Sequence, residues 1–148
     1  MKFKLAPYGK TVRDAALDCL DTGHRLMIFA GPDSWDVAKW YIARGEPPEH
    51  RDGYCLVLPP DQTVGAAHMA WPVRGRHVVV VDTGIGYRAL EPLTAALLRD
   101  QAASCWIWDL PRGMPGPDLE FNLSCLHWGH PVAPPIYCEP RDSQQQAA

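Results

Sequence analysis

Short apolar stretches of similar length recur along the chain and are separated by segments with helical spacing. Four of them predict strands that are covered on both faces, as in a parallel sheet. These stretches are residues 25–30, 54–58, 77–82 and 104–109. A glycine or proline follows each stretch closely, which is typical of the turn that ends a strand. The alternating polar and apolar residues 2–6 predict a short strand at an edge of the sheet.

Helical spacing of apolar residues predicts three helices in the intervals between these strands. They are expected over residues 12–22, 34–44 and 88–99. In the third helix, Leu90, Leu93 and Leu97 recur on one face. Pro92 has no N–H to donate to the preceding turn. We therefore expect Pro92 within the first turn, and a helix that starts near Arg88 or later.

Strands that alternate with helices are typical of the α/β class of folds. We therefore expect a single three-layer, Rossmann-like domain over residues 1–140, with a mainly parallel sheet of about five to six strands. Residues 121–126 and 136–138 predict one or two further strands near the C-terminus, which we expect to be antiparallel. The polar residues 141–148 predict a disordered tail. A chain of 148 residues is long enough for one such domain.

The charge distribution argues against a nucleic-acid partner. The net charge is −3, from 14 basic and 17 acidic residues, and no extended basic stripe is present. A protein that neutralises the phosphates of a duplex needs such a stripe. We therefore expect no duplex nucleic acid as a partner.

Hydropathy and cysteine content predict a cytoplasmic protein. No apolar run approaches the roughly 18 residues of a membrane span, so we expect no membrane association. The first residues lack the apolar core of a signal peptide. The five cysteines are odd in number and widely spaced, which is typical of reduced thiols rather than of a disulfide framework.

The segment from Asp82 to Asp109 has the pattern most typical of a ligand site. After the strand at 77–82 comes Gly84-Ile-Gly86-Tyr-Arg-Ala89, which reads G-x-G-x-x-A, and Asp109 ends the next strand. This pattern resembles the dinucleotide-binding fingerprint, in which glycines let the backbone approach a pyrophosphate and a later acid holds a ribose hydroxyl. Residues 82–86 also resemble the D-x-G-x-G strand end of S-adenosylmethionine-dependent methyltransferases. We therefore expect a phosphate-bearing or nucleotide ligand bound by Asp82, Thr83, Gly84, Gly86 and Asp109.

Two other interpretations of this segment stay open. The glycines can serve only the turn between a strand and a helix, without any ligand. Alternatively, if the strands that end at Asp82 and Asp109 are neighbours, their carboxylates can meet at one edge of the sheet. Paired carboxylates there can hold a metal ion or exchange protons.

A second candidate site lies near the C-terminus. Its members are Cys125, His127, His130 and Cys138. Two thiols and two imidazoles are the ligand types of tetrahedral zinc sites. The spacing matches no common zinc motif, so this is a metal site only if the fold brings all four side chains together. Packing of the two cysteines in the core is the alternative.

Aromatic residues supply a third hypothesis. The chain has six tryptophans, at positions 35, 40, 71, 106, 108 and 128. Trp106 and Trp108 have the same parity along one strand, so both should face the same side of the sheet. Trp40, Tyr41 and the proline-flanked Trp71 are candidates for a surface that recognises another protein or forms a homodimer. Burial in the core is the alternative.

No complete catalytic arrangement is present in the sequence. No serine lies in a G-x-S-x-G setting, and no cysteine has an adjacent activating base. Whether the protein is an enzyme stays open, and no cofactor is identified. We expect a small binding protein that uses the glycine turn. The alternatives are a non-catalytic interaction protein with a Trp- and Pro-rich surface, and a metal-dependent enzyme or zinc-stabilised domain.

Overall fold

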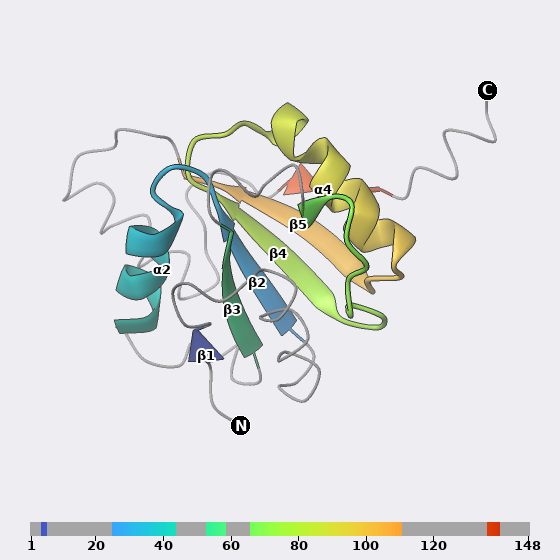
Figure 1. Cartoon of the computed structure of the whole chain (residues 1–148), viewed down its shortest axis with the longest axis horizontal. Coiled ribbons are helices and arrows are strands. Elements are labelled where there is room, and N and C mark those ends of the chain that lie inside the picture. The colour runs from blue at the N-terminus through green and yellow to red at the C-terminus, as the bar shows by residue number, and fades with distance from the viewer. Residues whose placement is uncertain (1–3, 6–24, 44–52, 59–65, 111–135, 140–148) are drawn as a thin grey trace.

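A computed structural model describes residues 4–5, 25–43, 53–58, 66–110 and 136–139 (Figure 1). The strands are β1 (Lys4–Leu5), β2 (Arg25–Ala30), β3 (Gly53–Leu58), β4 (His77–Asp82), β5 (Ser104–Asp109) and β6 (Ile136–Tyr137), and the helices are α2 (Ser34–Ala43) and α4 (Tyr87–Arg99). The strands form one sheet in the order β1-β3-β2-β4-β5-β6. All neighbours are parallel except β5 and β6. The described residues thus form a mixed α/β fold with a mostly parallel sheet, as the sequence predicted.

Strands β2 and β4 occupy the middle of the sheet because both are apolar along most of their length. Residues 26–30 are 0 % exposed, and residues 78–81 are at most 6 % exposed. Their register places Ile28 opposite Val80 and Ala30 opposite Asp82. A strand hydrogen-bonded on both sides and covered on both faces needs this continuous apolar pattern.

The two described helices pack on opposite faces of the sheet. The core under α4 contains Leu26, Ile28, Val78, Val80, Leu90, Leu93, Leu97, Cys105 and Ile107, among others. The core under α2 contains Met27, Phe29, Val37, Ala38, Tyr41, Val79, Val81 and Trp108, among others. Alternate residues of each strand therefore belong to different cores, as the period-2 geometry of a strand requires. Trp106 packs against the same core as Trp108, so the parity prediction for this pair is confirmed.

Helix α4 corrects one expectation about its start. It begins at Tyr87 and contains Pro92 in its second turn, not its first. A proline there removes the hydrogen bond to the carbonyl of Arg88. The helix continues because Leu90, Leu93 and Leu97 are each at most 1 % exposed against the sheet, and tertiary packing outweighs the local helix preference.

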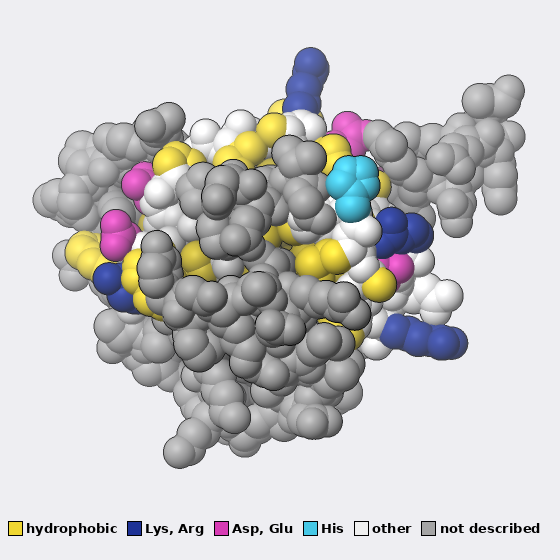
Figure 2. Space-filling view, viewed as in Figure 1, with side chains coloured by type: hydrophobic (Ala, Val, Ile, Leu, Met, Phe, Trp, Pro, Cys, Tyr) yellow, Lys and Arg dark blue, Asp and Glu magenta, His cyan; other side chains and the backbone are white. Residues whose placement is uncertain are grey.

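Several predicted elements lie outside the described residues. These are the helix over 12–22, the strand over 121–126 and the tail over 141–148. The predicted antiparallel strand near residue 136 is present as β6. No described helix has the length and apolar character needed to cross a membrane. On the face shown in Figure 2, the described Lys and Arg side chains are scattered and form no basic stripe.

Candidate functional site

The order of the strands creates a topological switch point between β2 and β4. From β2 the chain continues through α2 to β3 on one side, and β4 then lies on the other side of β2. Open α/β sheets bind ligands outside the carboxyl ends of their strands at such a point. The segments that follow β2 and β4, residues 31–33 and 83–86, therefore lie where a ligand site is expected.

The carboxylate of Asp82 is fully engaged with the glycine turn that follows it. The N–H groups of Gly84 and Ile85 donate to Oδ1 at 2.9 and 2.7 Å, and the N–H of Gly86 donates to Oδ2 at 2.8 Å. Gly84 and Gly86 have φ values of 117° and 100°, which explains the need for glycine. Asp82 is 1 % exposed. The turn thus binds an anion that belongs to its own strand.

The hydrogen bonds from the turn to Asp82 affect the hypothesis that a phosphate binds this turn, which stays a prediction. A phosphate at a glycine-rich turn is held by the backbone N–H groups of that turn. The N–H groups of Gly84, Ile85 and Gly86 already donate to Asp82. A phosphate on them would have to displace a buried carboxylate and leave it without those partners, which is costly. The geometry therefore argues against a phosphate on this turn.

Thr83 joins the carboxyl end of β4 to that of β2. Its hydroxyl donates to the carbonyl of Ala30 at 2.8 Å and accepts the N–H of Asp33 at 3.2 Å. Its own N–H donates to the same Ala30 carbonyl at 2.8 Å. Gly31 lies so close to Thr83 that a Cβ atom at Gly31 would overlap the hydroxyl, and Gly31 has a φ of 114°. These contacts give Thr83 a structural role at the switch point.

Two further hydrogen bonds connect neighbouring strand ends. The hydroxyl of Ser34, the first residue of α2, donates to the carbonyl of Leu58 in β3 at 3.2 Å. The N–H of Leu110 donates to the carbonyl of Asp82 at 2.7 Å. Many polar groups at this edge are therefore used to hold the edge together.

Of the two candidate carboxylates at the carboxyl edge, Asp109 is the exposed one. It lies opposite Asp82 in the register of β4 and β5, so the two strands are neighbours, as the carboxylate-pair hypothesis required. Partial burial and the negative charge of Asp82 raise the pKa of Asp109 above its ordinary value. The carboxylate of Asp82 is engaged by the turn, which leaves Asp109 to contact a ligand at this edge.

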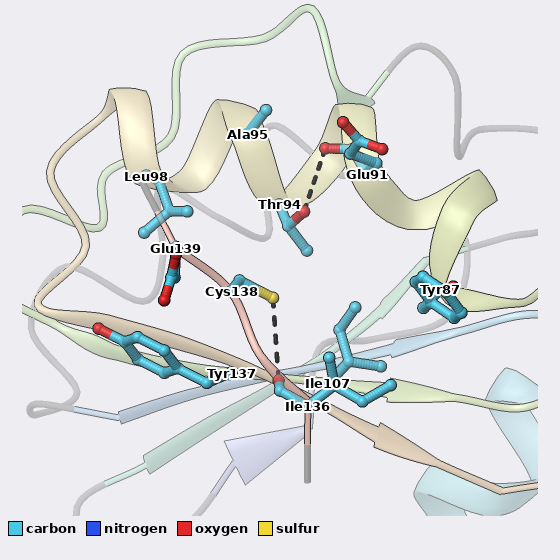
Figure 3. A pocket seen from close by; sticks show the side chains of 10 residues that line it. All are labelled: Tyr87, Glu91, Thr94, Ala95, Leu98, Ile107, Ile136, Tyr137, Cys138 and Glu139. Carbon is cyan, nitrogen blue, oxygen red and sulfur yellow. Dashed lines mark hydrogen bonds between the residues drawn. The ribbon is translucent and has the colours of Figure 1, made fainter. Parts of the chain in front are cut away.

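A cavity lies beside α4, between this helix and strands β5 and β6 (Figure 3). Its volume is about 420 Å³. Its lining residues are Tyr87, Glu91, Thr94, Ala95, Leu98, Ile107, Ile136, Tyr137, Cys138 and Glu139. One end begins at Tyr87, directly after the glycine turn. Sequence reasoning missed this cavity, because its far wall is formed by β6, which returns to β5 from a distant part of the chain.

Of the four residues in the zinc hypothesis, one lies within the described part of the chain. Cys138 is described and lines the cavity, whereas Cys125, His127 and His130 lie outside the described residues. Within the described part of the chain, no group of three or more His, Cys, Asp or Glu side chains is arranged to hold a metal ion. The four-ligand site therefore stays a prediction.

The predicted aromatic surface disagrees with the burial of two of its three members. Tyr41 is 0 % exposed and Trp71 is 4 % exposed, whereas Trp40 is 38 % exposed. The Tyr41 ring packs on Phe29, with ring centroids 5.7 Å apart. The Trp71 indole N–H donates to the carbonyl of Ala66 at 2.9 Å. Tyr41 and Trp71 are thus core residues, because their large rings fill space between the sheet and the segments packed on it.

The sequence signals for Thr83 and Gly31 were present but ambiguous. Thr83 followed a strand and Gly31 preceded a proline, which also fits an ordinary turn. Only the adjacency of β2 and β4 shows that these two residues touch each other. No match was found when the chain was compared with protein-family models, with curated proteins and with solved structures.

Proposed function

We propose that the protein binds a small molecule in the cavity between α4 and the β5–β6 edge of the sheet. The observation that carries the proposal is the cavity itself, with a volume of about 420 Å³. Sites for small molecules occupy roughly 300–1,000 Å³ and combine apolar walls with a few polar groups. Leu98, Ile107 and Ile136 supply the apolar walls here, and Thr94 and Glu139 are among the polar groups.

The charges around the cavity favour a ligand that donates hydrogen bonds. Among the described lining residues, the charged ones are Glu91 and Glu139, both acidic. The Arg88 guanidinium lies outside this lining and donates to the Tyr87 hydroxyl at 3.4 Å. The side chains of Tyr87 and Thr94 add hydroxyl groups. The two carboxylates disfavour a phosphate group in this cavity through the repulsion between like charges. We therefore propose an amine or a polyhydroxylated compound with an apolar part as the ligand class, and a nucleoside rather than a nucleotide if a base is present.

The test is a crystallographic screen with amine, polyol, nucleoside and phosphate-ester fragments on the full chain. We expect amines or polyols to gather between α4 and β6. Glu91→Gln and Glu139→Gln should weaken the binding of cationic fragments, measured by calorimetry. Asp36→Asn is the matched control, because Asp36 lies on α2, which packs on the opposite face of the sheet. Fragments bound only at other places, or phosphate esters bound to the glycine turn, would contradict the proposal.

A second candidate function is recognition of another protein at β6. This strand ends the described sheet, and its residues Ile136 and Tyr137 are 38 % and 50 % exposed. An edge strand with exposed apolar side chains can add a strand from another chain. Light scattering on Tyr137→Lys and wild-type protein tests self-association. If the wild-type protein is a monomer at all concentrations, it does not form a homodimer through β6.

We also infer that the whole domain is a three-layer, Rossmann-like one in the cytoplasm. The packing of α2 and α4 on opposite faces supports the layer assignment. The described cysteines, Cys55, Cys105 and Cys138, are free thiols, which supports a reducing compartment. An experimental structure that places residues 6–24 outside the two helical layers would contradict the layer assignment.

A further inference from the structure

Cys105 and Cys138 lie opposite each other on neighbouring strands. In the antiparallel register of β5 and β6, Ile107 is opposite Ile136 and Trp106 is opposite Tyr137. The next pair in this register is Cys105 and Cys138, and the N–H of Cys138 donates to the carbonyl of Cys105 at 2.9 Å. In such a hydrogen-bonded pair the Cα atoms are about 5.5 Å apart. Disulfides form when this distance is about 4.4–6.8 Å.

The two thiols are on the same face of the sheet and differ in their access to solvent. Cys105 is 0 % exposed within the core under α4, and Cys138 packs against that core. The sulfur of Cys138 points into the space between α4 and β5, beside Thr94 (Figure 3). A small reagent in the cavity can therefore reach Cys138, whereas Cys105 is fully buried and does not line the cavity.

The surroundings of the two thiols give them different roles. Hydrogen bonding to its thiolate by the neighbouring Cys105 and Thr94 lowers the pKa of Cys138, against the opposing effect of partial burial. The same bond to Cys138 and the burial of the sulfur raise the pKa of Cys105. The thiolate is the reactive form of cysteine. Because Cys138 also lines the cavity while Cys105 is 0 % exposed, Cys138 is the nucleophile of the pair.

We propose that Cys105 and Cys138 are a redox-active pair that a small hydroperoxide converts into a reversible disulfide. The Cys138 sulfur attacks one peroxide oxygen, the O–O bond breaks, and water or an alcohol leaves, so that Cys138 becomes a sulfenic acid. The Cys105 sulfur then attacks the Cys138 sulfur, the S–O bond breaks, and water leaves. The two thiols are oxidised by two electrons in total, and the peroxide is reduced. This chemistry is independent of the small-molecule ligand proposed above.

The position of the pair favours a disulfide that is easily reduced. Opposed residues in a sheet have Cβ atoms about 4.5–5.5 Å apart, with the shorter distances in non-hydrogen-bonded pairs. A disulfide needs about 3.5–4.5 Å. The two-residue strand β6 must therefore move towards β5 to form the bond. A bond formed with such strain is more readily reduced, as in regulatory disulfides.

The test is mass spectrometry of the full chain carrying Cys19→Ser and Cys125→Ser, after treatment with hydrogen peroxide. We expect loss of two hydrogen atoms, a peptide linking Cys105 to Cys138, and recovery of both thiols with a dithiol reductant. With Cys138→Ser, no disulfide should form. With Cys105→Ala, Cys138 should instead accumulate sulfenic and sulfinic acid.

Cys55→Ser is the matched control, because Cys55 is a buried thiol in the core under α2 and burial raises its pKa. This variant should form the Cys105–Cys138 disulfide as the parent does. The proposal is overturned if peroxide leaves both thiols reduced under conditions that oxidise free cysteine. It is also overturned if, with all five cysteines present, Cys138 pairs with Cys125 or holds zinc in native mass spectrometry.

Discussion

The hydroxyl of Thr83, at the end of β4, lies against Gly31, at the end of β2, and a side chain at Gly31 would overlap it. The same hydroxyl is bonded to the Ala30 carbonyl and to the Asp33 N–H. The Thr83 hydroxyl, together with the backbone bond from the Thr83 N–H to the Ala30 carbonyl, therefore holds the two loops at the switch point together. This close approach requires that residue 31 has no side chain. This relationship explains a glycine that the sequence alone leaves as an ordinary turn residue.

Gly31→Ala is expected to destabilise the protein by about 2–4 kcal/mol, through the strain of a positive φ and the overlap with Thr83. Gly75→Ala is the control. Gly75 also has a positive φ, 74°, but no atom lies within 4 Å of the position of its Cβ. The control should cost only the conformational strain, about 1–2 kcal/mol. If urea denaturation shows the same loss in free energy of unfolding for both variants, the contact with Thr83 does not contribute to stability.

Asp82→Asn is expected to destabilise the protein by about 1–3 kcal/mol. The neutral amide keeps one oxygen, but its NH₂ group faces the N–H of Gly86, so one hydrogen bond to Oδ2 is lost. The matched control is Asp109→Asn at the opposed position in β5. If Asp82→Asn unfolds at the same urea concentration as the wild type, the turn does not depend on its own carboxylate and is available to another anion.

Asp109 is expected to make stability depend on pH in a defined direction. Its pKa in the folded protein is raised by burial and by Asp82, so the folded state binds a proton more tightly than the unfolded state. The stabilising contribution of Asp109 to the free energy of unfolding is therefore fully present below the ordinary carboxyl pKa. This contribution is lost as the pH rises through the raised pKa of Asp109. Asp109→Asn should raise Tm at pH 7 and have little effect at pH 3. A larger gain at pH 3 than at pH 7 would contradict this assignment.

Pro92→Ala is expected to stabilise α4. Pro92 is exposed, so its replacement removes no core packing, and it restores an N–H that can donate to the Arg88 carbonyl. Helix preference alone favours alanine over proline by about 3 kcal/mol, and a gain of about 1–3 kcal/mol is expected in the protein. Urea denaturation measures this gain. A loss of stability would mean that the backbone constraint of Pro92 contributes more than the hydrogen bond that Pro92 removes.

The sequence was most informative where apolar residues are continuous. The bounds of β2, β4 and β5 agree with the predicted stretches, because a strand buried on both faces needs an unbroken apolar run. The order of the strands in the sheet was not predictable. Parallel neighbours lie far apart along the chain, and the sequence does not show which of them pair. Tyr41 was assigned to an exposed surface, but it lies with Val37 and Ala38 on the buried face of α2. Its neighbour Trp40 is on the exposed face of this helix. The cavity was missed because it needs β6 beside β5.

The central claim is that a small molecule binds between α4 and β6, and a variant that fills this space tests it most directly. Leu98 lines the cavity, is only partly buried and points from α4 towards Glu139 (Figure 3), so Leu98→Trp can fill more of this space. Ala89→Trp is the control, because Ala89 is an exposed residue of α4 outside the cavity lining. Binding of the best amine or polyol fragment is measured by NMR titration. We predict that Leu98→Trp abolishes the shifts of the cavity residues and that Ala89→Trp retains them; unchanged binding to Leu98→Trp would contradict the account.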